Sequence, residues 1–262
     1  MQDLPPSCDR DNTVNRQLPF LKIIAAAVYF VWSYRAEFLK AISVPMLILV
    51  VVWGVWLTFT KELPLFVSWL FALLFGLSFS FLAVTCHRLV LVSSGDRFKP
   101  YQARWGFREL RFMGWLIAIY VIKALVVLII LRIILDAGGK LVGMGDGELS
   151  YWSKQLLAIP GLYVLARLSL TLPATAIDRR VGLKWSWVNT RGNGWRIFVV
   201  VGLFPLLMEL LFDLVAREGA TVVEQGVLFI LVYITIAIEV IALSLTYREL
   251  ESNGDQTERS YP

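Results

Sequence analysis

Long apolar stretches separated by short polar connections dominate the sequence. The hydrocarbon core of a bilayer is about 30 Å thick, so a helix that crosses it needs roughly 20 mostly apolar residues. Because backbone groups left unsatisfied in hydrocarbon are costly, each stretch is expected to be helical throughout. Six stretches have the required length: residues 41–59, 64–83, 112–135, 151–174, 195–215 and 227–247. They predict an all-α bundle of six membrane-spanning helices.

A seventh apolar run, residues 23–32, is too short to cross a bilayer and is flanked by Lys22 and Arg35. We interpret it as a helix that lies in the membrane interface, with its aromatic side chains at headgroup depth. A tilted additional span is the alternative. The chain then divides into a cytosolic N-terminal arm (1–20), a single six-span membrane domain (21–249) and a polar tail (250–262) that is expected to be disordered.

The composition agrees with this pattern. Of the 262 residues, 58% are apolar and only 17% are charged, and the mean hydropathy is +0.68. Water-soluble domains average about 45–50% apolar and about 25% charged residues, so a water-soluble single domain is excluded. One histidine and two cysteines cannot supply a disulfide scaffold or a His/Cys zinc site. The sequence therefore predicts no metal and no cofactor.

Lysine and arginine gather in alternate connections between the spans. The N-terminal segment, the second-to-third connection and the fourth-to-fifth connection are rich in them, whereas the other three connections hold few. Basic residues collect on the cytoplasmic side of membrane proteins. The pattern therefore predicts that both termini lie in the cytoplasm.

An aromatic and basic pattern precedes the first, third and fifth spans. Its members are Trp32 and Arg35, Trp105 and Arg108, and Trp187 and Arg191. Tryptophan and arginine at headgroup depth are typical of an amphipathic segment on anionic lipid. We therefore predict three sequential helical hairpins, each preceded by a cytosolic interfacial helix, with anionic lipid headgroups as partners. An ordinary aromatic belt gives the same pattern, and this alternative stays open.

The junction between the fourth and fifth spans carries the most specific pattern. It reads Leu172-Pro-Ala-Thr-Ala-Ile-Asp178, then Trp185-Ser-Trp187-Val-Asn-Thr-Arg191-Gly, then Trp195-Arg196. Pro173 is expected to end a span and Asp178 to cap the helix that follows. Two glycines, at positions 192 and 194, allow a sharp turn into the fifth span.

This junction resembles a broad group of bacterial six-span membrane proteins. The group includes the membrane domain of some glycerophosphodiester phosphodiesterases and a related uncharacterised inner-membrane family. The ending of the last span, residues 242–249, is similar to that group as well. The resemblance implies the six-span fold and residence in a bacterial inner membrane. It implies no activity, because the catalytic domain of those phosphodiesterases is separate from their membrane domain.

Ionisable side chains inside predicted spans cost about 2.5–3.5 kcal/mol each to insert, so each needs a partner, a hydrated cavity or a function. The four are Lys123, Arg167, Glu209 and Glu239. At 1.5 Å per residue, Lys123 and Glu209 lie about 17 and 21 Å from the cytoplasmic starts of their helices. Arg167 and Glu239 both lie about 11–12 Å from the cytoplasmic side. Matching depth predicts the pairs Lys123–Glu209 and Arg167–Glu239, which form either a polar path or fasteners between helices.

Two main classes of function fit these features. The first is transport or handling of a lipid or solute along the polar path. The second is a non-enzymatic scaffold or accessory subunit that binds a membrane protein, or a second copy of the chain, through its cytosolic Trp/Arg face, to which Trp195 and Arg196 belong. An intramembrane enzyme is least supported, because no paired nucleophile and base is apparent and no catalytic residue is predicted.

Two further features of the sequence add no chemistry of their own. His87, the single histidine, is expected to be a polar residue at the membrane edge. Basic residues follow the predicted topology, so no nucleic-acid partner is predicted.

Overall fold

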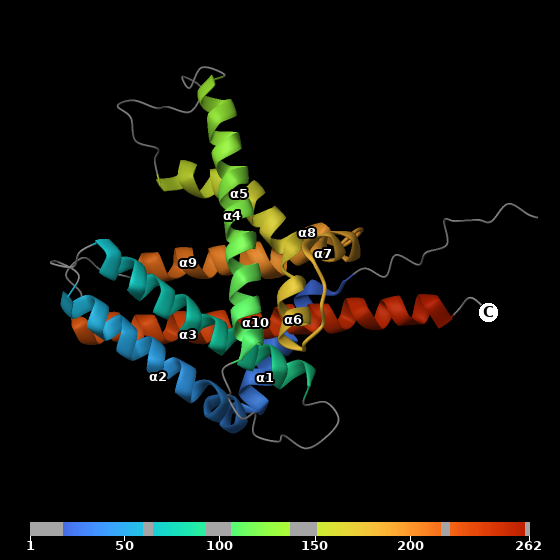
Figure 1. The fold of residues 1–262 in the computed structure, drawn as a ribbon. Helices are drawn as coiled ribbons and strands as arrows, with labels where there is room; N and C mark the ends of the chain where they lie inside the picture. The colour runs from blue at the N-terminus through green and yellow to red at the C-terminus, as the bar shows by residue number, and fades with distance from the viewer. Residues whose placement is uncertain (1–17, 60–64, 93–105, 137–150, 216–220, 260–262) are drawn as a thin grey trace, which may run out of the picture.

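The computed structural model describes residues 18–59, 65–92, 106–136, 151–215 and 221–259, and every regular element within these ranges is a helix (Figure 1). The helices are α1 (Phe20–Ser33), α2 (Arg35–Phe59), α3 (Leu65–Leu91), α4 (Phe107–Asp136), α5 (Tyr151–Leu168), α6 (Thr171–Ala176), α7 (Leu183–Asn189), α8 (Gly194–Phe198), the π-helix η2 (Val199–Leu203), α9 (Phe204–Val215) and α10 (Val222–Arg259). The predicted all-α fold is confirmed.

Six helical stretches in the described part of the chain are long and apolar enough to cross a membrane. They coincide with the six stretches predicted from the sequence. Their outward surfaces are apolar: Leu128, Ile129 and Ile133 on α4 are each more than half exposed. Apolar surface of this extent is not stable against water, whereas hydrocarbon accepts it. The chain is a multi-pass membrane protein.

The long helices pair into three consecutive hairpins, α2 with α3, α4 with α5, and α9 with α10. Figure 1 shows α2, α3, α9 and α10 running side by side, while α4 and the first part of α5 extend away from this group. The helix α1 is separate from α2, as predicted, and packs against α10. The second hairpin thus contacts the rest of the molecule mainly through one end.

The core of the molecule is formed by the last part of α3, the end of α5 with α6, and the middle of α10. Most residues are buried in segments 81–90 of α3, 166–176 of α5 and α6, and 237–247 of α10. The parts of the hairpins far from this core are more exposed. In the second half of α4, residues 121–136, no described side chain is buried. Tight packing is therefore concentrated at one end of the bundle.

These three buried segments each contain a buried threonine that bonds to its own helix. Thr85, Thr175 and Thr246 are at most 1% exposed. Each donates its hydroxyl to the carbonyl oxygen four residues earlier, at 2.8, 2.8 and 2.9 Å. The residue three positions after each threonine is charged: Arg88, Asp178 and Glu249. Buried threonines of α3, α6 and α10 therefore make the same local hydrogen bond, and the charges that follow them differ in sign.

The fourth and fifth spans are interrupted, which the sequence does not predict. The helix α5 ends at Leu168, two turn residues follow, and Pro173 lies inside α6 instead of ending the span. The fifth span contains a turn of π-helix, η2, immediately before Pro205. Proline lacks the N–H that the preceding turn would use, and π-turns arise where the regular hydrogen-bond ladder is interrupted.

The C-terminal tail differs from expectation. Residues after 249 are expected to be disordered, but α10 continues to Arg259. Arg179 forms an ion pair with Glu251, and its guanidinium also bonds to the Tyr247 hydroxyl at 2.7 Å. This contact fixes the beginning of the tail to the segment between α6 and α7.

Candidate functional site

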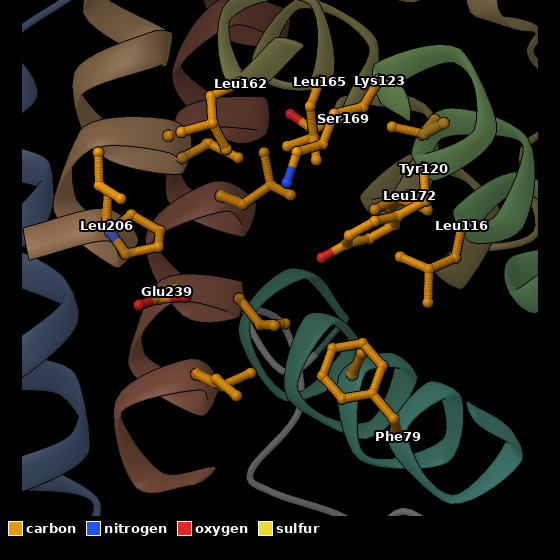
Figure 2. A pocket seen from close by; sticks show the side chains of 18 of the residues that line it. Phe79, Leu116, Tyr120, Lys123, Leu162, Leu165, Ser169, Leu172, Leu206 and Glu239 are labelled. Atoms are coloured by element: carbon orange, nitrogen blue, oxygen red, sulfur yellow. The ribbon is translucent and has the colours of Figure 1, made fainter. Parts of the chain in front are cut away.

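A cavity of about 370 Å³ lies between the second hairpin and the other two. Its walls come from α3, α4, α5, α6, η2, α9 and α10 and are mainly apolar. Figure 2 shows the amine of Lys123 and the hydroxyl of Tyr120 directed into the space from one side and the carboxylate of Glu239 on the other. The polar lining residues are His87, Tyr120, Lys123, Gln155, Ser169, Glu209 and Glu239. An apolar cavity with a few converging polar groups is the usual form of a ligand site.

Close helix contacts shape the cavity on two sides. A Cβ atom added to Gly161 of α5 would lie 2.8 Å from Val127 Cγ2 and 3.2 Å from the Lys123 carbonyl oxygen, so α4 and α5 touch backbone to backbone there. A Cβ on Gly202 of η2 would lie 3.4 Å from Leu162 Cβ. The π-turn therefore packs closely against α5, and the residues that follow it line the cavity.

Three of the four charged residues predicted inside spans meet in this cavity: Lys123 of α4, Glu209 of α9 and Glu239 of α10. The lysine amine lies 5.4 Å from the centroid of the Tyr120 ring. Within the part of the chain that the structure describes, no ion pair joins this lysine to either glutamate. The predicted partners Lys123 and Glu209 thus share a cavity without direct contact.

The predicted pair Arg167–Glu239 is wrong. Arg167 lies in the last turn of α5 and is directed at α7, where its guanidinium donates to the Thr190 hydroxyl and to the Trp187 carbonyl oxygen. Its Cζ also lies 4.2 Å from the centroid of the Trp187 ring. The pair was predicted from equal depth in the membrane, which assumes that the fourth span is one continuous helix. Instead α5 ends at Leu168, so Arg167 lies at a helix C-terminus, where a cation is favoured.

His87 is part of the cavity wall, which the sequence did not predict. It is 1% exposed, so the expectation of a polar residue at the membrane edge is wrong. Its Nδ1 lies 2.7 Å from the Ser244 hydroxyl oxygen of α10, and its ring lies 5.8 Å from the ring of Phe112. The histidine therefore links α3 to α10 beside the cavity. The sequence alone does not distinguish a buried histidine of this kind from one at the membrane edge.

A charged network joins α3 and α4 to the end of α6. Arg88, Arg108 and Arg111 approach Asp178, with nitrogen-to-oxygen distances of 3.4, 3.1 and 3.9 Å. Asp178 has a positive φ of 66°, a conformation that aspartate tolerates better than most residues. It does not cap the next helix, because the N-cap of α7 is Gly182. The predicted capping role is therefore wrong.

Glu109 belongs to the same network and was not singled out from the sequence. It is fully buried in the first turn of α4. Its carboxylate accepts the Gly106 N–H at 2.9 Å and two guanidinium contacts from Arg108 at 3.1 and 3.0 Å. Glutamate in the first turn of a helix satisfies free N–H groups there. Arg108 is therefore held by two carboxylates, and its side chain is 19% exposed.

The residues predicted to contact headgroups are mostly exposed at the same end of the bundle as the core. Trp32 is 72% exposed, and Arg35 lies over its ring at 5.8 Å. Trp195 is 56% exposed and packs edge-on against Phe20 of α1 at 5.7 Å. These contacts tie α1 to the start of α8.

The remaining predicted headgroup residues differ in their surroundings. Trp187 is half-buried under Arg167, and Arg191 is exposed. Arg196 donates to the Asn193 side chain at 3.2 Å. Trp105 lies outside the described residues.

No group of three or more His, Cys, Asp or Glu side chains that could hold a metal ion occurs in the described ranges. The charged groups that a ligand would meet in the cavity are two carboxylates, on α9 and α10, and one amine, on α4. The resemblance noted from the junction stays a prediction. No protein-family model, no curated protein and no solved structure matches this chain.

Proposed function

We propose that this protein binds and handles a lipid or small solute in the cavity between its second hairpin and the other two. The observation that carries the proposal is the position of Lys123, Glu209 and Glu239, which line the cavity. Each lies in a helical stretch that is apolar enough to span a membrane. Retaining a charge at such depth is costly unless water, a partner or a ligand meets it.

The alternative use of these charges, as fasteners between helices, predicts direct opposite-charge pairs. Arg167 contacts α7 instead of Glu239, and no ion pair joins Lys123 to a glutamate within the described ranges. Two opposite charges that do not touch contribute little to the alignment of their helices or to the free energy of unfolding. The arrangement therefore favours handling of a ligand over a structural role.

A cavity-filling variant tests the proposal. Ala158 of α5 lines the cavity, so Ala158→Trp reduces the space available to a ligand. Ala124 of α4 is exposed and does not line it, so Ala124→Trp is the matched control. Each protein is purified in nanodiscs cut from native membrane, and retained lipids and metabolites are identified by mass spectrometry. We expect a species retained by the parent and by the control and lost from Ala158→Trp; equal retention by all three contradicts the proposal.

We also propose a bacterial inner membrane as the location, with both termini cytoplasmic, and membership of the six-span group that the junction resembles. The alternation of basic connections supports the orientation. The exposed Trp32 and Trp195 support contact of this face with anionic lipid headgroups. No catalytic role is part of the proposal.

The second candidate function is a scaffold or accessory subunit. The observation in its favour is the same exposed tryptophan face, which a partner could cover. Under this reading Trp32→Ala abolishes co-purification of a membrane protein, while Ala158→Trp leaves it intact. If Ala158→Trp loses the retained ligand and Trp32→Ala keeps it, the result favours ligand binding in the cavity over the scaffold function.

A further inference from the structure

We propose that the cavity selects hydrophobic cations, that is, ligands with one positive charge on an apolar body. This inference rests on the proposed function and adds the class of ligand. It depends on the balance of charge in the lining and on where the charges lie. The charge balance and the positions of the charges both follow from the residues that line the cavity.

When both glutamates are ionised, the charge balance of the lining is negative. Two carboxylates, Glu209 and Glu239, face one amine, that of Lys123, and the other polar lining side chains are neutral when His87 is uncharged. Neither carboxylate has a hydrogen-bond or ion-pair partner among the residues that the structure describes. A monovalent cation would balance the lining, whereas a monovalent anion would double its excess charge.

The charges are also separated in space. Lys123 comes from α4, beside the ring of Tyr120, and both glutamates come from the third hairpin, on α9 and α10. Figure 2 shows the lysine amine and the Glu239 carboxylate on different sides of the space. A positive group bound beside Glu239 therefore lies on a different side of the space from the amine, next to the helix that carries Glu209. An anion has no equivalent position, because the described residues contribute a single amine to the lining.

The walls fit the apolar body of such a ligand. Phe79 of α3, Leu116 of α4 and Leu165 of α5 line the space around the charges. A cavity of about 370 Å³ lies in the size range of pockets that hold small organic ligands. Low-polarity walls strengthen the attraction between a carboxylate and a cation, because less water screens it. The same walls accept a charge only when its counter-charge is present.

A pair of ions of nearly equal shape and opposite charge tests the inference on the unmodified protein. Tetraphenylphosphonium and tetraphenylborate are titrated against the full chain in nanodiscs of neutral lipid, and Ala158→Trp provides the background from partition into lipid. We expect saturable phosphonium binding that is at least on the order of tenfold tighter than borate binding. Equal affinity for the two ions, or tighter binding of the borate, overturns the inference.

Charge-removing variants identify the source of the preference. Glu209→Gln and Glu239→Gln keep the side-chain shape and are each expected to weaken phosphonium binding about tenfold. Lys123→Met is expected to strengthen it. Glu224→Gln is the matched control, because Glu224 caps the start of α10 and lies outside the cavity. Unchanged affinity in both cavity glutamine variants contradicts the inference.

The outcomes separate the two levels of proposal. If neither probe binds above background while the parent still retains a native species that Ala158→Trp loses, the choice of cations is wrong and the proposed function stands. If native retention also fails to depend on the cavity, the proposed function fails with it.

Discussion

Arg167 shows how one buried cation can be satisfied without a carboxylate. Its guanidinium donates to the Thr190 hydroxyl and the Trp187 carbonyl oxygen and lies over the Trp187 ring. The Tyr163 hydroxyl, at 3.3 Å, is a further contact. The planar fork of arginine suits such a set of directed acceptors. Arg167 therefore anchors α7 to α5.

A double-mutant cycle tests this assignment. Arg167→Met is expected to lower the free energy of unfolding by about 2–3 kcal/mol, because directed bonds from a buried charged group are lost. Arg167 should couple energetically to Thr190→Val and not to Glu239→Gln, since only Thr190 is in contact with it. SDS-induced unfolding in mixed micelles gives both coupling energies. A larger coupling with Glu239 would restore the pair that was predicted from depth.

At this scale the sequence allowed only part of the site to be predicted. Lys123, Glu209 and Glu239 could be found because charges in apolar runs are conspicuous. The absence of direct pairing among them, and the contact of Arg167 with α7, could not be predicted, because pairing by equal depth assumes straight and parallel helices. His87 was missed because its burial depends on α10 packing over α3, which local sequence does not reveal.

At the scale of elements, the second hairpin is the most distinctive. The helices α4 and α5 are held together where Gly161 meets α4, while the hairpin as a whole extends away from the others (Figure 1). The length of each apolar run was enough to predict the spans. The break after Leu168 and the π-turn before Pro205 could not be predicted, because proline inside a membrane helix usually permits the helix to continue.

Gly161→Ala tests the close contact within this hairpin. The new methyl group would lie 2.8 Å from Val127 Cγ2, so we expect a loss of about 1–3 kcal/mol in unfolding free energy. Val127→Ala in the same chain should recover part of that loss. Gly114→Ala on α4 is the matched control, because nothing lies within 4 Å of its added Cβ. If Gly161→Ala is as stable as Gly114→Ala, α4 and α5 do not touch as described.

At the scale of the whole molecule, packing and charge divide the bundle into two ends. The buried segments of α3, α6 and α10 lie at one end with the network around Asp178. Arg179 and Glu251 extend this end into the tail. Basic residues that the sequence assigns to the cytoplasm thus take part in the tightly packed end, so orientation and stability are linked.

The proposed orientation makes a direct prediction for the C-terminus. A fluorescent protein fused after Pro262 should fluoresce, because it folds in the cytoplasm, and alkaline phosphatase fused at the same point should be inactive. Fusions in the connection between α2 and α3 provide the control and should give the reverse result. Active phosphatase at the C-terminus would contradict the orientation.

The central claim is that the cavity lined by Lys123, Glu209 and Glu239 admits a ligand from outside the bundle, and thiol accessibility in intact membranes tests it most directly. Single cysteines replace Ala158, which lines the cavity, and Leu128, which is exposed on the outer surface of α4, in a chain whose Cys8 and Cys86 are replaced by alanine. A charged, water-soluble methanethiosulfonate reagent modifies only thiols that water reaches. We predict rapid modification at position 158 and none at position 128. Modification at 128 with none at 158 would contradict the account.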